Sequence, residues 1–318
     1  MNMQPTPRNV KNLSNYAMQP MSFEEAVKVF LYHIKNICNY SQKTISSYES
    51  DFNQMAIFLK SIGCDDVREI SPSVIADYII YKREKGLNPR SVNRHLAAAR
   101  SLFDFLCRFK GLEANPAHAI KNLKTAKVLP LFITEEKMDL LINKYLPGNT
   151  FKQMRTRIAI LIFYHTGIRC TELLRLRDED VNFSSQTMKV TGKGNKQRYI
   201  PFGDELETEL RKYIAMRDDA ILSRNLSRCL MRTQNGEQMT AYQIRKMVRL
   251  PLLRIVPRIY CHPHVLRHTF ATALMNHGAS IEAIKLLLGH ESVETTAMYE
   301  HVSATKLKSV YNIAFDRK

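Results

Sequence analysis

The sequence predicts a mainly α-helical protein with a small β-sheet, divided into two domains. Four segments of helical periodicity follow one another within residues 21–112, which indicates a compact helical domain. A polar stretch at 113–130 interrupts that periodicity. Beyond it, further helical segments flank one strand–turn–strand pattern, and this mixture is typical of an α+β domain. The length of 318 residues agrees, since a domain spans roughly 150 residues.

The N-terminal domain is predicted to contain four helices after a flexible leader, residues 1–20. Ser22 and Ser41 each precede apolar residues spaced by three and four, so each is expected to cap a helix. A third helix is predicted to begin at Ser71 and a fourth near Pro89, because proline is favoured in the first helical turn. Residues 21–112 therefore form the first predicted domain.

Residues 113–130 are predicted to be an interdomain linker, since they carry two prolines, three lysines and few core residues. The second domain is predicted to span 131–318. Within it, 186–202 has the pattern of two short strands around a glycine-containing turn. Helices are predicted at 134–146, 151–166, 170–177, 204–222, 240–255, 264–277, 280–288 and 292–300.

Charge narrows the class of partner. The chain has 47 Lys and Arg against 30 Asp and Glu, a net charge of +17, which favours a polyanion such as nucleic acid. Most of the excess falls in two segments, 150–200 and 211–260. The longest apolar run, 158–164, is far below the roughly 20 residues that cross a bilayer. No membrane partner is therefore expected. Six scattered cysteines without a CxxC pair suit a reducing cytoplasm.

Basic and hydroxyl side chains gather at two helix starts of the N-terminal domain. Such groups suit phosphate contacts, because the backbone N–H groups of a helix start add partial positive charge. A solvated helix surface is the alternative interpretation. The candidate DNA contacts here are Lys43, Thr44, Ser47, Arg90, Asn93, Arg94 and Arg100.

Several short motifs of the C-terminal domain occur in a suggestive order. Each is weak by itself, since a single tyrosine or a His-x-x-Arg pair is usually structural. Arg169 follows a glycine between two helices, and Lys193 lies in a Gly-Lys-Gly turn. His264 and Arg267 fall on one helical face at i and i+3. His290 follows Leu-Gly, and Tyr299 comes nine positions later.

This ordered set resembles the tyrosine recombinases, the phage-integrase family, over most of the chain. The resemblance implies an N-terminal core-binding domain of SAM-like fold and a C-terminal α+β catalytic domain. It also implies Tyr299 as nucleophile and Glu172 as a supporting acidic residue. Lys196 is left open as an alternative to Lys193, and Lys196 and Arg245 join the candidate DNA contacts. The implied catalytic set is Arg169, Lys193, His264, Arg267, His290 and Tyr299.

The chemistry of these residue types fits the implied reaction. Two guanidiniums bind the oxygens of a phosphodiester bidentately. A tyrosine hydroxyl has a pKa near 10, so a base such as His264 must help it attack, and Lys193 can protonate the leaving oxygen. The resemblance implies a 3′-phosphotyrosine, with no ATP, metal or other cofactor. Zinc at Cys261, His262, His264 and His268 is disfavoured, because no second half of a structural site exists.

The resulting hypothesis is a site-specific DNA recombinase that integrates, excises, inverts or resolves DNA. Its expected partners are double-stranded DNA with inverted-repeat core sites and further copies of the chain in a tetramer. With only about 20 residues before the helical domain, a simple Xer- or invertase-like type without an arm-binding domain is expected, cytoplasmic and at the bacterial nucleoid. Alternatives are a type IB topoisomerase and a non-catalytic DNA-binding protein.

The tail carries an apolar stripe, which the resemblance implies docks on a neighbouring protomer. The stripe could instead pack on its own domain. Its members are Leu307, Val310, Tyr311 and Ala314.

Overall fold

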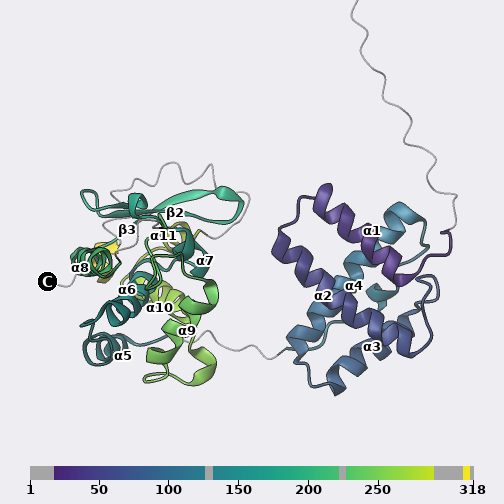
Figure 1. Ribbon diagram of the computed structural model, residues 1–318. Coiled ribbons are helices and arrows are strands. Elements are labelled where there is room, and N and C mark those ends of the chain that lie inside the picture. Colours follow the sequence, from purple (N-terminus) through teal and green to yellow (C-terminus); the bar gives the residue numbers. More distant parts are fainter. Residues whose placement is uncertain (1–17, 126–131, 222–226, 290–310, 316–318) are drawn as a thin grey trace, which may run out of the picture. The chain divides into compact units, whose positions relative to one another are not determined.

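A computed structural model describes residues 18–125, 132–221, 227–289 and 311–315, in two compact units, 1–128 and 129–318. The predicted fold class is confirmed, since the described parts are mainly helical with one small antiparallel sheet (Figure 1). None of the described helices is long and apolar enough to cross a membrane. Each unit has its own hydrophobic core, and the two are treated separately below.

The N-terminal unit consists of four helices around an apolar core. The helices are α1 (Phe23–Asn36), α2 (Gln42–Ser61), α3 (Pro72–Glu84) and α4 (Pro89–Lys110). The expected caps are confirmed, because the side chains of Ser22, Ser41 and Ser71 each accept a hydrogen bond from a first-turn N–H. Asn88 caps α4 in the same way, one residue before its N-terminal proline.

Part of the segment expected to be a linker is packed on α4. Residues Pro116–Ala119 form a 3₁₀ turn, η1, in which Ala117 is fully buried. Arg100 of α4 donates to the carbonyls of Ala117 and Ile120 and to the side chain of Asn122. The backbone of this segment is therefore anchored to the helical unit as far as its described residues reach.

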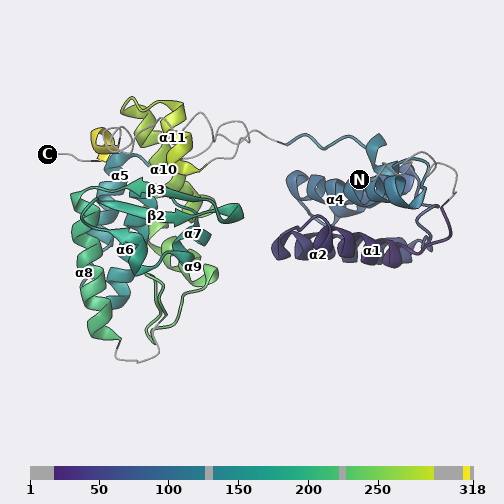
Figure 2. The same ribbon diagram turned by 90° about the horizontal axis from the view of Figure 1, so that it is seen from above.

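The C-terminal unit is built around a central helix, α6 (Phe151–Thr166), which lies between α8 (Asp204–Ala220) and α10 (Pro263–Asn276) (Figures 1 and 2). Nearly every residue of α6 from 158 to 166 is buried, so this helix forms the middle of the core. The remaining helical elements are α5 (Glu135–Leu140), which continues into the π-turn η2 (Leu141–Tyr145), α7 (Cys170–Arg175), the 3₁₀ turn η3 (Asp178–Asp180), α9 (Ala241–Leu252), the 3₁₀ turn η5 (Arg258–Tyr260) and α11 (Ile281–Leu288).

The sheet has three antiparallel strands in the order β1 (Val181–Asn182), β2 (Thr187–Thr191) and β3 (Gln197–Pro201). The predicted hairpin corresponds to β2 and β3, whose register pairs Val190 with Arg198. The short strand β1 was not predicted. The turn η4 (Lys193–Asn195) joins β2 to β3 and takes a left-handed backbone at Gly194, with φ of 68°.

The described part of the tail, residues 311–315, packs on its own unit. Tyr311 is fully buried, and its hydroxyl lies 3.2 Å from Nδ1 of His165 on α6. The ring of Phe315 stacks on Phe270 of α10, at 5.5 Å between centroids. Ala314 is buried as well. The predicted helix 292–300 and the stripe residues Leu307 and Val310 lie outside the described residues.

Candidate active site

Arg169 and Arg267 meet where α6, α7, α10 and α11 come together. Gly167 ends α6 in a left-handed conformation, φ 60°, and two residues later Arg169 stands at the start of α7. Arg267 projects from α10, and its Nη1 donates to the carbonyl of Gly167 at 2.6 Å. The glycine break therefore places the first arginine and is itself held by the second.

Glu172 joins the arginines with both carboxylate oxygens. Its Oε2 accepts from the backbone N–H of Arg169 at 2.7 Å, and its Oε1 accepts from Nη1 of the same residue at 3.0 Å. The carboxylate is only 3% exposed. Burial alone would raise the pKa of Glu172, but hydrogen bonds and positive charge from Arg198 and Arg169 outweigh it and lower the pKa. The group is an anion that holds its cations in fixed positions.

Arg198 is a third arginine of the site, and the sequence interpretation missed it. It projects from β3 and binds Glu172 bidentately, with Nη1 to Oε1 at 3.0 Å and Nη2 to Oε2 at 2.9 Å. Its Nε donates to the carbonyl of Leu287 at 2.8 Å. In the sequence Arg198 is one of many basic residues, and no local motif distinguishes it.

The three arginines bind three consecutive carbonyls at the end of α11. Arg198 donates to Leu287, Arg267 to Leu288 at 2.6 Å, and Arg169 to Gly289 at 3.2 Å. A helix C-terminus leaves its last carbonyls without intrahelical partners and carries partial negative charge, so cations are stabilising there. The end of α11 is thereby fixed next to the arginine pair, and the following residue is His290.

Arg267 is the more deeply placed of the phosphate-binding candidates, at 7% exposure. Burial, followed by the positive charge of Arg169, lowers the pKa of Arg267 to about 10. That value still leaves the guanidinium charged at neutral pH. Each of Arg169 and Arg267 has five N–H donors, and the hydrogen bonds found within the described ranges use two in each. Donors therefore remain for a phosphate.

His264 lies near the beginning of the same helix, α10, three residues before Arg267. Its side chain reaches solvent, yet desolvation by surrounding protein atoms lowers its pKa, and positive charge on His262 and Arg267 adds to this. His264 is therefore neutral at pH 7 and has a ring nitrogen able to accept a proton.

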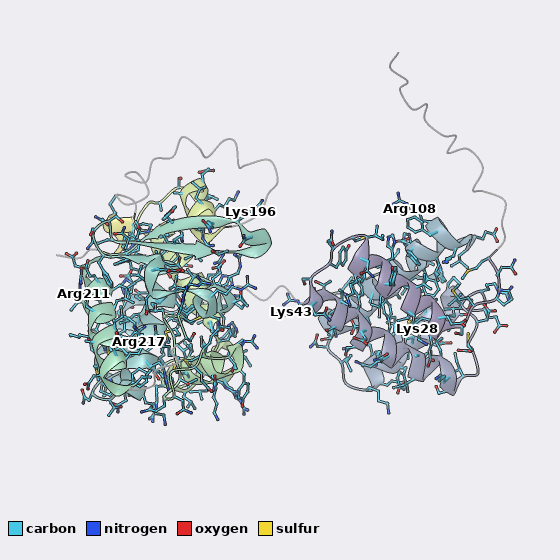
Figure 3. The ribbon with its side chains drawn as sticks, turned by 45° about the horizontal axis from the view of Figure 1, so that its top comes forward. Lys28, Lys43, Arg108, Lys196, Arg211 and Arg217 are labelled. Carbon is cyan, nitrogen blue, oxygen red and sulfur yellow. The ribbon has the colours of Figure 1, made fainter. Side chains whose placement is uncertain are left out.

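The other members of the predicted catalytic set lie only partly within the described residues. The backbone of Lys193 is in the turn η4, where the hairpin meets the site. Lys196 is exposed near the same turn (Figure 3). His290 and Tyr299 lie outside the described residues. The structure thus brings together Arg169, Glu172, His264 and Arg267.

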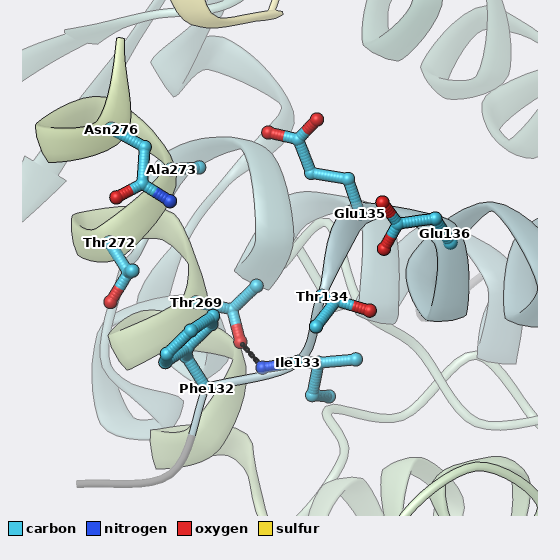
Figure 4. Close-up of a pocket in the computed structure, with 9 residues that line it drawn as sticks. All are labelled: Phe132, Ile133, Thr134, Glu135, Glu136, Thr269, Thr272, Ala273 and Asn276. Atoms are coloured by element: carbon cyan, nitrogen blue, oxygen red, sulfur yellow. Dashed lines mark hydrogen bonds between the residues drawn. The ribbon is translucent and has the colours of Figure 1, made fainter. Parts of the chain in front are cut away.

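Among the described residues, His, Cys, Asp and Glu form no group of three able to hold a metal ion, and the thiol of Cys261 lies 3.4 Å from the carbonyl of Pro257. A hollow of about 330 Å³ lies between α10 and the chain before α5, where Ile133 donates to Thr269 (Figure 4). It contains none of the predicted site residues.

The candidate DNA contacts of the N-terminal unit separate into two groups. Arg94 of α4 donates to the hydroxyl of Ser47 on α2 at 3.0 Å and to the buried carboxylate of Asp51 at 2.7 Å. Thr44, Ser47 and Arg94 line one hollow of about 160 Å³, and Lys43 of α2 and Arg90 of α4 are exposed (Figure 3 labels Lys43).

Asn93 and Arg100 are used differently. The amide of Asn93 exchanges two hydrogen bonds with the backbone of Leu123, at 2.8 and 2.9 Å, and Arg100 holds the segment around η1. These contacts fix the end of the helical unit. They give both side chains a structural role that needs no contact with DNA. In the C-terminal unit, Arg245 of α9 is exposed and lies close enough to Cys170, the residue after Arg169, for its positive charge to act on that thiol.

Comparison with known proteins finds two matching family models. The model of the "Phage integrase family" matches residues 132–306, and that of the "Phage integrase, N-terminal SAM-like domain" matches residues 27–110. The tyrosine recombinase XerC of Staphylococcus saprophyticus is 31% identical over 294 residues, covering 92% of this chain and 98% of that protein. XerC of Bacillus subtilis is 32% identical over 290 residues, covering 90% and 94%.

Solved structures share the fold. The Tn1549 transposon integrase in complex with transposon right end DNA superposes with a TM-score of 0.69 at 19% identity, covering 92% of this chain and 98% of that one. XerH bound to its difH substrate superposes with a TM-score of 0.66 at 21% identity, covering 92% of this chain and 84% of that one. The chain therefore belongs to the phage integrase family, the tyrosine recombinases.

Proposed function

We propose that the protein is a site-specific DNA recombinase that cleaves and rejoins strands through a 3′-phosphotyrosine at Tyr299. The observation that carries this proposal is the pair Arg169 and Arg267, with donors left over. Arg169 is fixed by Glu172 and the carbonyl of Gly289, and Arg267 by the carbonyls of Gly167 and Leu288. Two preorganised guanidiniums at one place are what a phosphodiester under attack requires, because its non-bridging oxygens gain negative charge.

The first step transfers a phosphoryl group from DNA to the protein. The hydroxyl oxygen of Tyr299 bonds to phosphorus while the bond from phosphorus to the 5′-oxygen breaks. His264, neutral because its pKa is lowered, accepts the tyrosine proton. Lys193 gives a proton to the leaving 5′-oxygen, which departs as a hydroxyl. Arg169 and Arg267 bind the non-bridging oxygens throughout.

The second step is the reverse reaction with a different strand. A 5′-hydroxyl of the partner duplex attacks the phosphotyrosine, and Tyr299 leaves with its proton restored. The number of phosphoester bonds is unchanged in each step, so the exchange needs no nucleotide hydrolysis. His290, which follows the end of α11 by two residues in the sequence, is assigned a hydrogen bond to the phosphate.

The proposed partner is double-stranded DNA with inverted-repeat core sites, recognised jointly by both units. The solved structures of the Tn1549 integrase in complex with transposon right end DNA and of XerH bound to difH support this. The proposed contacts of the N-terminal unit to the DNA phosphate backbone are Lys43, Thr44, Ser47, Arg90 and Arg94.

In the catalytic unit, Lys196 and Arg245 are added to those contacts. We propose a tetramer in the synaptic complex, and the whole reaction in the cytoplasm at the nucleoid. Tyr311 and Ala314 are buried in their own unit here, so docking of the tail on a neighbouring protomer would require this segment to leave that place.

A covalent adduct tests the proposal. A binding site is first selected from a random duplex library with the wild-type protein, and a nick next to the cleavage position then traps the intermediate. Wild type should give a protein–DNA adduct on a denaturing gel, and Tyr299→Phe should give none. Tyr242→Phe is the matched control, because Tyr242 is an exposed tyrosine of α9 and should leave the adduct unchanged.

Two results would contradict the proposal. The first is a wild-type protein that binds the selected duplex without forming an adduct. The second is efficient relaxation of a supercoiled plasmid that lacks the site, which would indicate a topoisomerase.

A further inference from the structure

Arg198 is the one arginine of the site for which the proposed mechanism has no role. Its side chain is 14% exposed and makes three hydrogen bonds, two to Glu172 and one to the carbonyl of Leu287. Those partners lie on α7 and α11, so a residue of the sheet is connected to two helices that frame the arginine pair.

The position of Arg198 in the hairpin makes these contacts an anchor for the turn between β2 and β3. Along the chain from the turn, residues 194–197 are exposed, and Arg198 is the first side chain that reaches the interior. Its partner in the register, Val190 on β2, is buried, and the next buried residue of β3 is Ile200. Arg198 is thus the anchor of the hairpin nearest to the turn that carries Lys193.

The backbone around the anchor is closely fitted to it. A Cβ placed on Gly192, directly before Lys193, would lie 3.4 Å from Oε1 of Glu172 and 3.7 Å from Nη1 of Arg198. A Cβ on Gly289, at the end of α11, would lie 3.1 Å from the same Nη1. The Glu172–Arg198 pair is therefore in contact with both chain segments that lead to predicted catalytic residues.

We propose that Arg198 is a positioning residue that holds the β2–β3 turn against Glu172 and the end of α11, so that Lys193 reaches the leaving 5′-oxygen. This inference rests on the proposed function. Arg198 does not contact the phosphate in this account, because each of its three guanidinium nitrogens already donates to Glu172 or to the carbonyl of Leu287. Without it the turn keeps its strand pairing but loses its fixed place in the site.

A DNA substrate with sulfur in place of the bridging 5′-oxygen tests this role directly. A thiol has a pKa of about 8.5, whereas water has one of about 16, so a thiolate leaves without a proton while an alkoxide needs one. Arg198→Ala should cleave the ordinary duplex about 10- to 100-fold more slowly than wild type, within the range of general acid catalysis. On the sulfur duplex the same variant should come within about threefold of wild type, because the acid is then dispensable.

Arg217→Ala is the matched control. Arg217 of α8 is also a buried arginine, bidentate to Asp178 at 2.7 and 3.0 Å and bonded to the carbonyl of Leu230, but these partners lie outside the site (Figure 3). Its loss should lower the melting temperature without changing the ratio of the two cleavage rates. Arg198→Lys is the second variant, since it keeps the charge but not the bidentate geometry, and should show a smaller defect of the same kind.

The outcomes separate this inference from the proposed function. Equal loss on both duplexes, or no loss on either, in folded Arg198 variants would overturn the role of Arg198. Lys193→Ala and Lys196→Ala are tested in parallel. If sulfur relieves neither lysine variant, the turn supplies no acid, and both the acid role of the turn and the positioning role of Arg198 fail, while adduct formation still tests the recombinase itself. If sulfur relieves one lysine variant but not Arg198→Ala, only the positioning role fails.

Discussion

Gly167→Ala is the substitution whose effect the structure determines most directly. Gly167 ends α6 with φ of 60°, a conformation that residues with a Cβ rarely adopt. An added Cβ would lie 2.4 Å from Cδ1 of Phe270 and 2.9 Å from Cδ2 of Leu288, both below any normal contact distance. Both neighbours are buried in the core, so neither has free space into which to move.

Two costs add in this variant. The left-handed conformation costs an alanine about 1–2 kcal/mol. Forcing a methyl group into a packed core costs about 1–3 kcal/mol more, because Phe270 and Leu288 must shift. The free energy of unfolding should therefore fall by about 2–5 kcal/mol, which for a unit of this size lowers the melting temperature by about 4–20 °C.

Gly278→Ala supplies the matched control for thermal unfolding followed by circular dichroism. Gly278 follows α10 with φ of 81°, and a Cβ there would meet nothing within 4 Å. It should bear the backbone cost alone, so Gly167→Ala should be the less stable by the packing cost, about 1–3 kcal/mol. Cleavage by folded Gly167→Ala should also be slower, since the Gly167 carbonyl holds Arg267. Equal stability of the two variants would refute the packing argument.

Four further predictions concern the site and the DNA surface. Because the pKa of His264 lies below its usual 6.5 and the neutral ring is the active form, the cleavage rate should stay level from pH 8 to about 6.5 and fall only at lower pH; a fall already centred above pH 7 would contradict this. Cleavage should persist in EDTA, since guanidiniums supply the positive charge, and chelator-sensitive adduct formation would count against it. Lys43→Ala and Arg90→Ala should each reduce the dependence of log affinity on log salt by about one, whereas an unchanged slope would remove them from the DNA surface. Arg94→Ala should destabilise the N-terminal unit by about 1–3 kcal/mol by leaving the buried carboxylate of Asp51 without its cation, and adding Asp51→Asn should recover part of that loss in thermal melts.

Helix starts were predictable from sequence because their signals are local. Ser22, Ser41 and Ser71 bond to N–H groups within the next three residues, so a short window of sequence contains the whole interaction. Strand β1 has no such window. Its two residues become a strand only through pairing with Met188 and Thr187 of β2, and two residues carry no periodicity.

The same distinction applies to the site. Arg169 and Glu172 are three residues apart and stand in a motif, so the sequence could associate them. Arg198 acts through Glu172, 26 residues away in the sequence, and through Leu287, 89 residues away. Only the folded chain brings these residues into contact. Asn93 shows the converse, because basic neighbours made it resemble a DNA contact while its amide is bound to Leu123.

The arrangement of charge explains how three arginines can share one place before DNA is bound. Like charges at such proximity repel. Burial, and then the positive charge of Arg169, lower the pKa of Arg267. One carboxylate, Glu172, offsets part of this, and the carbonyl end of α11 offsets more. The balance stays positive, which is the condition for capturing a phosphate. Because Arg198 binds both carboxylate oxygens from the side of the hairpin, Glu172 is held in place while Arg169 and Arg267 keep donors that no hydrogen bond within the described ranges uses.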